Sequence, residues 1–267
     1  MNLVGRILKE QSSNFHLILR LARYDMKGKY QLHYLGAVWQ FLTPVIQVLL
    51  YWLVFGIGIR GGAPVHGVPF FAWLMVGLIP WFFISPSILQ GSNSVYARVS
   101  LVSKMKFPVS ILPTVTIISN SFQLIVMLVV LAFIFIVYGI NPGLHILQLP
   151  YYLVSLFIFL FAVTLLGSTI STIVRDFQQA LQAIMRMMVY LLPILWDQSR
   201  LPHVFQTVLK LNPIYYLIEG FRNSFLGYAW FYDDWIYTLY FWVVTLLILL
   251  VGSVLHIKFR KKFIDYL

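Results

Sequence analysis

Six apolar stretches, each long enough to cross a lipid bilayer, constrain this chain more than any other feature. A membrane-spanning helix needs about 20 mostly apolar residues, because each residue adds about 1.5 Å to a crossing of about 30 Å. Hydrophobic residues make up 60% of the 267 residues and charged residues only 10%, far from the composition of a soluble protein. The sequence therefore predicts an all-α integral membrane protein with six transmembrane helices, at 39–59, 70–89, 109–138, 151–174, 177–196 and 235–256.

The positive charges are distributed unevenly about these spans. If the N-terminus is cytosolic, all but four of the 19 Lys and Arg residues lie on the cytosolic side or nearer to it. Membrane topology thus explains the net charge of +11, which argues against nucleic acid as a partner. We expect both termini in the cytosol, with an interfacial region 1–38, a transmembrane domain 39–256 and a cytosolic tail 257–267.

Residues 13–27 predict an amphipathic helix before the first span. Phe15, Ile18, Ala22 and Met26 recur at helical spacing, while basic residues occupy the other faces. We expect this helix to lie at the membrane interface, with its basic residues near lipid headgroups. The alternative is an ordinary solvated helix in the cytosol.

The connector that follows this helix carries two lysines and two tyrosines. It lies where a phosphate-bearing lipid headgroup would arrive from the inner leaflet. Lysines attract phosphate, and tyrosines can stack on the faces of sugars. The alternative is plain electrostatic anchoring to anionic lipid. The candidate substrate-path residues here are Lys27, Lys29, Tyr30 and Tyr34.

A short polar stretch between the second and third spans predicts a helix parallel to the membrane. Ser92 or Ser94 can cap its start, and three valines follow at i, i+4 and i+7 spacing. The stretch carries Arg98 and Lys104, so the loop is expected to face the cytosol. A helix that joins two spans without crossing the membrane is suited to act as a lever for a cytosolic partner.

The external segment 197–234 is long and mostly apolar, yet prolines divide it into two pieces too short to span. Asn212 can cap the second piece, which begins at Pro213. Glu219 and Arg222 stand at i, i+3 spacing, where they can pair. We expect two short re-entrant helices that gate a pathway on the outer side, with a surface hairpin as the alternative.

The fifth span carries a polar stripe that does not suit lipid. Gln178, Gln182, Arg186 and Tyr190 fall at successive i+4 steps. Because an arginine near mid-span is costly unless it faces protein or water, we expect this stripe to face a dimer axis or an export path. Alternatively, the helix begins late and Arg186 extends to the cytosolic interface.

The sequence offers no candidate catalytic or metal-binding cluster. It lacks a Gly-x-x-x-x-Gly-Lys-[Ser/Thr] phosphate loop and a Gly-x-Ser-x-Gly motif, and its six histidines have no paired metal-ligand spacing. Acidic residues are missing from the interiors of the spans, which argues against a proton-coupled carrier. We therefore expect a pore or permease that has no energy source of its own.

Four long stretches carry a resemblance to a known family. They are LARYDMKGKYQLHYLGAVWQFLTP, GLIPWFFISPSILQGSNSVYARVSLVSKMKFPVSILP, RDFQQALQAIMRMMVYLLPILW and LNPIYYLIEGFRNSFLG. With these stretches the chain resembles permeases of the ABC-2 type, specifically those that export lipid-linked polysaccharides and teichoic acids. Within that group, EQSSNFHLILRLARYDMKGKYQLHYLG and YWLVFGIGIRGG most resemble the membrane subunit of wall teichoic acid exporters.

The resemblance implies a homodimeric permease in the bacterial cytoplasmic membrane that binds two copies of a separate ABC ATPase. That ATPase would bind ATP and magnesium, so no cofactor is expected in this chain. The partners would be a second copy of the chain, the ATPase, membrane lipid and a lipid-linked glycopolymer. The residues expected to contact the ATPase are Ser94, Tyr96, Arg98, Leu101 and Lys104, with Tyr96 and Leu101 as buried anchors.

The resemblance leaves more than one cargo open. The first is lipid-linked teichoic acid. The second is a polysaccharide of the O-antigen or capsule type, because O-antigen permeases share the middle motifs. An ABC-2 exporter of a drug or simple lipid is a third reading, since one scaffold serves several cargoes. A membrane-bound transferase or a passive channel is disfavoured, because catalytic clusters and rings of acidic residues are missing from the sequence.

Overall fold

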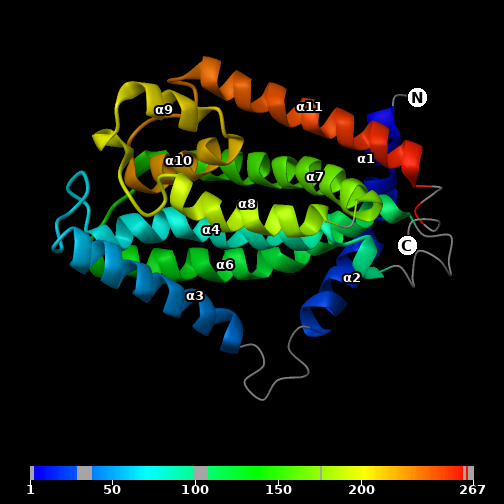
Figure 1. Ribbon diagram of the computed structural model, residues 1–267. Helices are drawn as coiled ribbons and strands as arrows, with labels where there is room; N and C mark the ends of the chain where they lie inside the picture. Colours follow the sequence, from blue (N-terminus) through cyan, green and yellow to red (C-terminus); the bar gives the residue numbers. More distant parts are fainter. Residues whose placement is uncertain (1–2, 29–37, 99–107, 175, 261–262, 264–267) are drawn as a thin grey trace.

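The computed structural model describes residues 3–28, 38–98, 108–174, 176–260 and 263, and every regular element in this part of the chain is helical. Five helical segments are long and apolar enough to cross a membrane (Figure 1). They agree with five of the six predicted spans to within three residues at each end, except that the fourth begins at residue 143 and not at 151. Their elements are α3 (Val38–Tyr51) with η1 (Trp52–Ile59), α4 (Phe70–Ser92), η3 (Val109–Ile111) with α6 (Leu112–Tyr138), η4 (Gly143–Gln148) with α7 (Leu149–Ile173), and α11 (Trp235–Phe259).

The helix observed at the remaining predicted span, 177–196, is shorter than predicted. Helix α8 (Phe177–Leu191) has 15 residues, so it is about 22 Å long and cannot cross a bilayer of about 30 Å alone. The prediction of a helix that continues to residue 196 is wrong because Pro193 lacks a backbone N–H and disfavours helix at the residue before it. Leu192 accordingly has extended backbone angles, φ −76° and ψ 148°.

Helix α4 is the centre of the bundle. It packs against α3, α6, α7, α8 and α10, and 78% of its most apolar window is buried, compared with 17% for the window in α3 and η1. Helix α11 packs along α7 on the other side of the bundle (Figure 1). The main core therefore consists of apolar side chains from α4 and its neighbours, including Trp73, Phe83, Leu156 and Phe221.

Small residues bring the central helices close together. Gly167 of α7 lies against Ser92 of α4, and Gly220 of α10 lies against the ring of Tyr152 of α7. A Cβ atom at either glycine would overlap its neighbour. In a bilayer, where lipid is as apolar as leucine, such close packing drives helix association.

The two ends of the bundle carry different elements (Figure 1). At one end α1 (Leu3–Ser13) contacts α11, and α2 (Phe15–Gly28) packs across α6. The predicted amphipathic helix at 13–27 is thus present as α2, with Ile18 and Ala22 buried against Ile111 and Val115 of the third span. The 3-10 helix η2 (Tyr96–Arg98) follows α4 at this end.

The opposite end carries the two short helices predicted after residue 197. They follow a 3-10 turn, η5 (Gln198–Arg200). Helix α9 (His203–Lys210) is mostly exposed, whereas α10 (Pro213–Leu226) buries most of its length against α4 and α7. Helix α10 is therefore part of the bundle core and not a surface hairpin.

The close contact between α7 and α10 predicts a large effect of a single methyl group. Replacing Gly220 by Ala should overlap the buried Tyr152 ring, and overpacking of this kind costs about 1–3 kcal/mol. The midpoint of thermal unfolding of the purified protein should fall by several degrees, measured by intrinsic fluorescence. Gly5→Ala is the matched control, because nothing lies within 4 Å of the added methyl group there. Equal midpoints for the two variants would contradict this packing.

Candidate functional site

The predicted polar stripe of α8 borders an open pocket of about 510 Å³ between α3, α4 and α8. Gln182, Arg186 and Tyr190 line it from α8, and the Arg186 and Tyr190 side chains are exposed. Within the described part of the chain, no carboxylate lies within ion-pair distance of Arg186. The Arg186 guanidinium is therefore available to an external ligand, and the Gln182 amide lines the same pocket. The facing wall consists of Tyr51, Trp81, Ser85 and Leu89.

Gln178, the first residue of the stripe, has a different environment. Its Nε2 donates to the backbone oxygen of Leu89 at 3.0 Å, and its Oε1 accepts from Ser171 Oγ at 3.5 Å. These bonds join the start of α8 to the ends of α4 and α7. Because its polar atoms are engaged inside the protein, Gln178 is a structural residue here and does not line the pocket.

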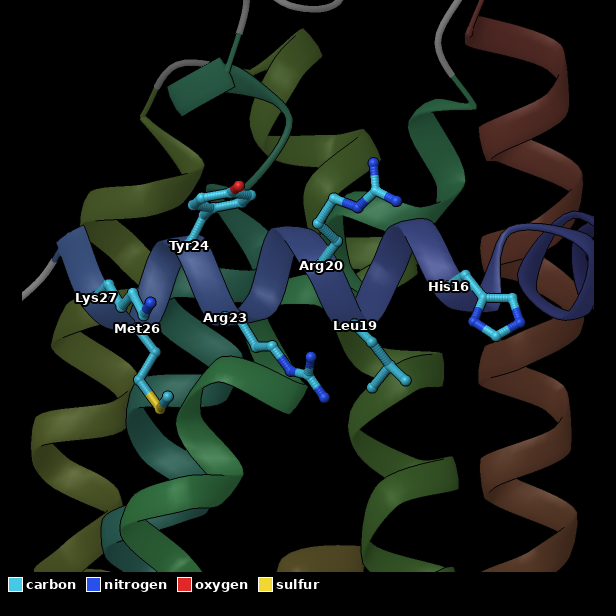
Figure 2. A pocket seen from close by; sticks show the side chains of 7 residues that line it. All are labelled: His16, Leu19, Arg20, Arg23, Tyr24, Met26 and Lys27. Carbon is cyan, nitrogen blue, oxygen red and sulfur yellow. The ribbon is translucent and has the colours of Figure 1, made fainter.

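The outer surface of α2 forms a shallow basic pocket of about 560 Å³ (Figure 2). Lys27, one of the four predicted connector residues, lies in this pocket. Lys29, Tyr30 and Tyr34 lie outside the described residues. The pocket is lined by His16, Leu19, Arg20, Arg23, Tyr24, Met26 and Lys27, so it carries three arginine or lysine side chains.

The predicted lever between α4 and α6 is described up to Arg98. Its first residues form the single 3-10 turn η2 rather than an α-helix, and the Ser92 and Ser94 hydroxyls are buried without a hydrogen-bond partner, so neither is a cap. Tyr96 is 49% exposed. Leu101 and Lys104 lie outside the described residues.

Arg98 forms an ion pair with Asp25 of α2. The bond crosses from η2 to α2, between residues that are 73 positions apart in the sequence. Sequence reasoning missed this pair, because Asp25 is simply one polar residue in an amphipathic pattern and nothing in that pattern names a partner.

A second polar cluster joins α1 to the ends of α6 and α11. Glu10 accepts hydrogen bonds from Arg260 Nη1 at 2.8 Å and from Ser110 Oγ at 2.7 Å, with Arg6 at 3.8 Å. Gln11 donates to the backbone oxygen of Ser110 at 2.9 Å. Burial alone would raise the pKa of Glu10, but the hydrogen bonds from Ser110 and Arg260 and the charges of Arg260 and Arg6 outweigh it and lower the pKa.

At the opposite end, Arg222 of α10 is buried in the protein. Its Nη1 donates to Glu219 Oε1 at 2.7 Å, which is the i, i+3 pair predicted from the sequence. Its Nη2 donates to the backbone oxygen of Ile194 at 3.1 Å, and the guanidinium stacks 3.7 Å from the centroid of Trp73. Gly77 leaves room for this group, since a Cβ atom there would lie 2.9 Å from Nη2.

The other predicted gate residues begin α10. Asn212 caps the helix by accepting from the backbone N–H of Ile214 at 3.0 Å, and Pro213 is its first residue. Glu219 lines a smaller cavity, of about 210 Å³, between α10 and the start of α11. Tyrosines dominate its walls: Tyr152, Tyr215, Tyr216 and Tyr237.

Among the described residues, no group of three or more His, Asp or Glu side chains is placed to hold a metal ion. The pocket beside α8 and the cavity beside α10 offer binding chemistry, from amides, phenols, a carboxylate and a guanidinium.

Comparison with known proteins shows the class of protein. Residues 16–226 match the family described as ABC-2 type transporter, and the chain belongs to this family. It is thus an ABC-2 membrane permease, a multi-pass protein with five candidate spans in the described residues.

Individual relatives are named for polysaccharide export. The chain is 27% identical over 222 residues to an O-antigen export system permease protein RfbA of Myxococcus xanthus, covering 82% of this chain and 84% of the relative. It is 26% identical over 254 residues to a protein of the same name from Klebsiella pneumoniae, covering 95% of both. These relatives agree better with the second cargo expected from the sequence than with teichoic acid.

The Glu10 cluster predicts a pH-dependent stability. Because the pKa of Glu10 lies below its ordinary value of 4.5 in the folded protein, the stabilisation is complete above about pH 4.5 and is lost as the pH falls through the lower, folded value. Unfolding midpoints of the wild type and of Glu10→Gln should therefore differ most near neutral pH and converge in acid. A difference that stays constant from pH 7 to pH 3.5 would contradict this account.

Proposed function

We propose that this chain is the permease subunit of an ATP-driven exporter that moves a lipid-linked polysaccharide of the O-antigen type across the bacterial cytoplasmic membrane. The observation that carries the proposal is the pocket between α3, α4 and α8. Helix α8 of this ABC-2 type transporter presents an arginine, an amide and a phenol to it. Hydroxyl-rich polymers bind such groups through hydrogen bonds, and phosphate binds the planar fork of a guanidinium.

The proposed topology has six crossings with both termini in the cytosol. Five long helices alone would leave the beginning and end of the chain on opposite sides of the membrane. Ile7 of α1 nevertheless packs against Leu249 of α11, and Glu10 binds Arg260. These contacts support an even number of crossings, in which α8 and the buried residues after it complete the sixth.

The cytosolic side in this proposal is the end that holds α1 and α2. It carries the basic surface of α2 and Arg98, which follows α4, as the positive-inside rule expects. Regions 1–38 and 257–267 are then cytosolic or interfacial, and α9 and α10 form the external gate, with Asn212, Pro213, Glu219 and Arg222 as its residues.

A separate ATPase is proposed as the energy source, because the sequence has no phosphate loop. Two copies of the permease and two of the ATPase would form the exporter. The pocket beside α8 would then face the second copy and contribute half of the export path. The loop that begins with Ser94, Tyr96 and Arg98, and continues through Leu101 and Lys104, would contact the ATPase.

Teichoic acid remains a second candidate cargo. The motifs before the first span resemble teichoic acid exporters, whereas the relatives named above are O-antigen permeases. Both cargoes combine hydroxyl groups with phosphate, so the same pocket chemistry suits both. Export assays with each lipid-linked polymer, in the presence of the partner ATPase, decide between them.

The first test of the proposed path concerns Arg186. Replacing it by Gln should reduce export of a phosphate-bearing, lipid-linked polymer by about ten-fold, because a hydrogen bond to a charged group contributes about 1.5–3 kcal/mol. Arg186→Lys keeps the charge and should retain more activity. Transport is measured in vesicles that contain the permease and its ATPase.

The control for this test lies on the same helix. Gln182→Ala changes a residue that lines the pocket, whereas Gln179→Ala changes an exposed glutamine outside it. Export should fall in the first variant and remain at the wild-type rate in the second. Equal export by Arg186→Gln and the wild type, with the ATPase still bound, would rule out this path.

The second test concerns coupling to the ATPase. Tyr96 is the one exposed aromatic residue of η2, and such side chains supply much of the binding energy at protein interfaces. Tyr96→Ala should lower cargo-stimulated ATP hydrolysis several-fold without changing membrane insertion, measured by phosphate release from the reconstituted complex. Tyr24→Ala, which alters an exposed tyrosine on α2, is the matched comparison. Unchanged hydrolysis in Tyr96→Ala would remove Tyr96 from the contact.

A further inference from the structure

An apolar groove lies beneath the elbow between α1 and α2. It has a volume of about 400 Å³ and runs between α6 and α7. Its walls include Phe15 of α2, Ile118 of α6 and Ile158 of α7. Two polar residues of the wall satisfy each other, since Thr114 Oγ1 donates to Gln11 Oε1 at 2.9 Å. The groove therefore suits a hydrocarbon chain and offers little to a polar ligand.

The side chains of α2 point in two directions (Figure 2). Leu19, Arg23 and Met26 point along the spans, toward the body of the bundle, whereas Arg20 and Tyr24 point to the opposite side of the helix. Leu19 stands four residues after Phe15, and Arg23 four residues after Leu19, so these three side chains share one face of α2. Along this face, the apolar surface that begins at the groove ends at the guanidinium of Arg23. The distance along the helix from Phe15 to Arg23 is about 12 Å.

The charge on this side of α2 has no counterpart in the described residues. Asp25 is the one acidic residue of α2, and it is engaged by Arg98. Arg23 has no carboxylate within ion-pair distance among the described residues. A cation at the edge of an apolar surface, with no carboxylate partner among the described residues, matches an anionic headgroup above a hydrocarbon chain.

We propose that this surface binds one anionic phospholipid of the membrane leaflet that meets the α1 and α2 end. One acyl chain occupies the groove between α6 and α7, the second covers Leu19 and Met26, and the phosphate binds Arg23. The lipid is a component of the membrane and not the exported cargo, so this site is separate from the pocket beside α8. Helix α2 would then contact the lipid through Arg23 and bind Arg98 through Asp25.

The occupant is a phospholipid because the groove and the cation must be filled together. A free phosphate ion would leave the apolar groove empty, and an uncharged chain would leave Arg23 without a counter-ion. A second copy of this chain would need to present a carboxylate beside an apolar helix at membrane depth. A phospholipid supplies both groups in one molecule and is abundant at this depth.

The experiment uses the full chain in nanodiscs that contain equal amounts of phosphatidylglycerol and phosphatidylcholine. After gentle release into detergent, native mass spectrometry measures which lipid remains bound. The wild type should retain phosphatidylglycerol about five-fold over phosphatidylcholine, because one basic side chain near an anionic lipid contributes about 1 kcal/mol. Arg23→Gln should remove this preference, and Arg20→Gln, which alters the opposite side of the same helix, should keep it.

A second pair of variants tests the groove. Ile158→Trp fills it and should lower retention of both lipids, whereas Val154→Trp, on an exposed part of α7 outside the groove, should not. The proposal is overturned by equal losses in Arg20→Gln and Arg23→Gln, or by unchanged retention in Ile158→Trp. Displacement of the lipid by glycerol phosphate would indicate a free-phosphate site, and preferential retention of a prenyl phosphate would indicate a cargo site. Either of these results also overturns it.

Discussion

The guanidinium group of Arg222 stabilises the bundle where helix α8 ends and the backbone becomes irregular. In hydrocarbon, every backbone carbonyl needs a partner inside the protein, and the break after α8 leaves several without a helical one. Arg222 donates to the carbonyl of Ile194 at this break while it stacks on Trp73 and pairs with Glu219. A buried charge is stable only when paired and hydrogen-bonded, so the break, α4 and α10 depend on one another. The arrangement also requires a glycine at position 77, because a Cβ atom there would collide with the guanidinium of Arg222.

The long membrane-spanning helices could be predicted from the sequence, whereas the early end of α8 could not. Length and hydropathy located five spans, because a continuous apolar run has no other stable state in a bilayer. Length and hydropathy did not predict that α8 ends before Pro193, since the hydropathy of 192–196 is the same whether these residues continue a helix or turn into the core. The caps of α10 were predictable because Asn212 and Pro213 act on their own backbone, within two residues.

The site was predictable in part for the same physical reason. The stripe on α8 follows from helical periodicity alone, so Gln182, Arg186 and Tyr190 lie together as predicted. Contacts between distant segments do not follow from periodicity. Gln178 is engaged by the end of α4, and Asp25 by Arg98, through bonds between residues far apart in the sequence. A pattern shows which face of a helix is polar, and the tertiary structure decides which of those groups remain available.

The contact between the first and last helices has a consequence for how the protein is made. Ile7 and Glu10 of α1 find their partners, Leu249 and Arg260, on the last helix of the chain. During synthesis, this contact therefore forms only after α11 has been translated and inserted, whereas the bonds of α1 to Ser110 and Thr114 can form earlier. An amphipathic segment can wait on the membrane surface, where lipid covers its apolar side. The amphipathic character of this region thus serves the nascent chain as well as the finished bundle, and the closing of α1 onto α11 is a late step of assembly.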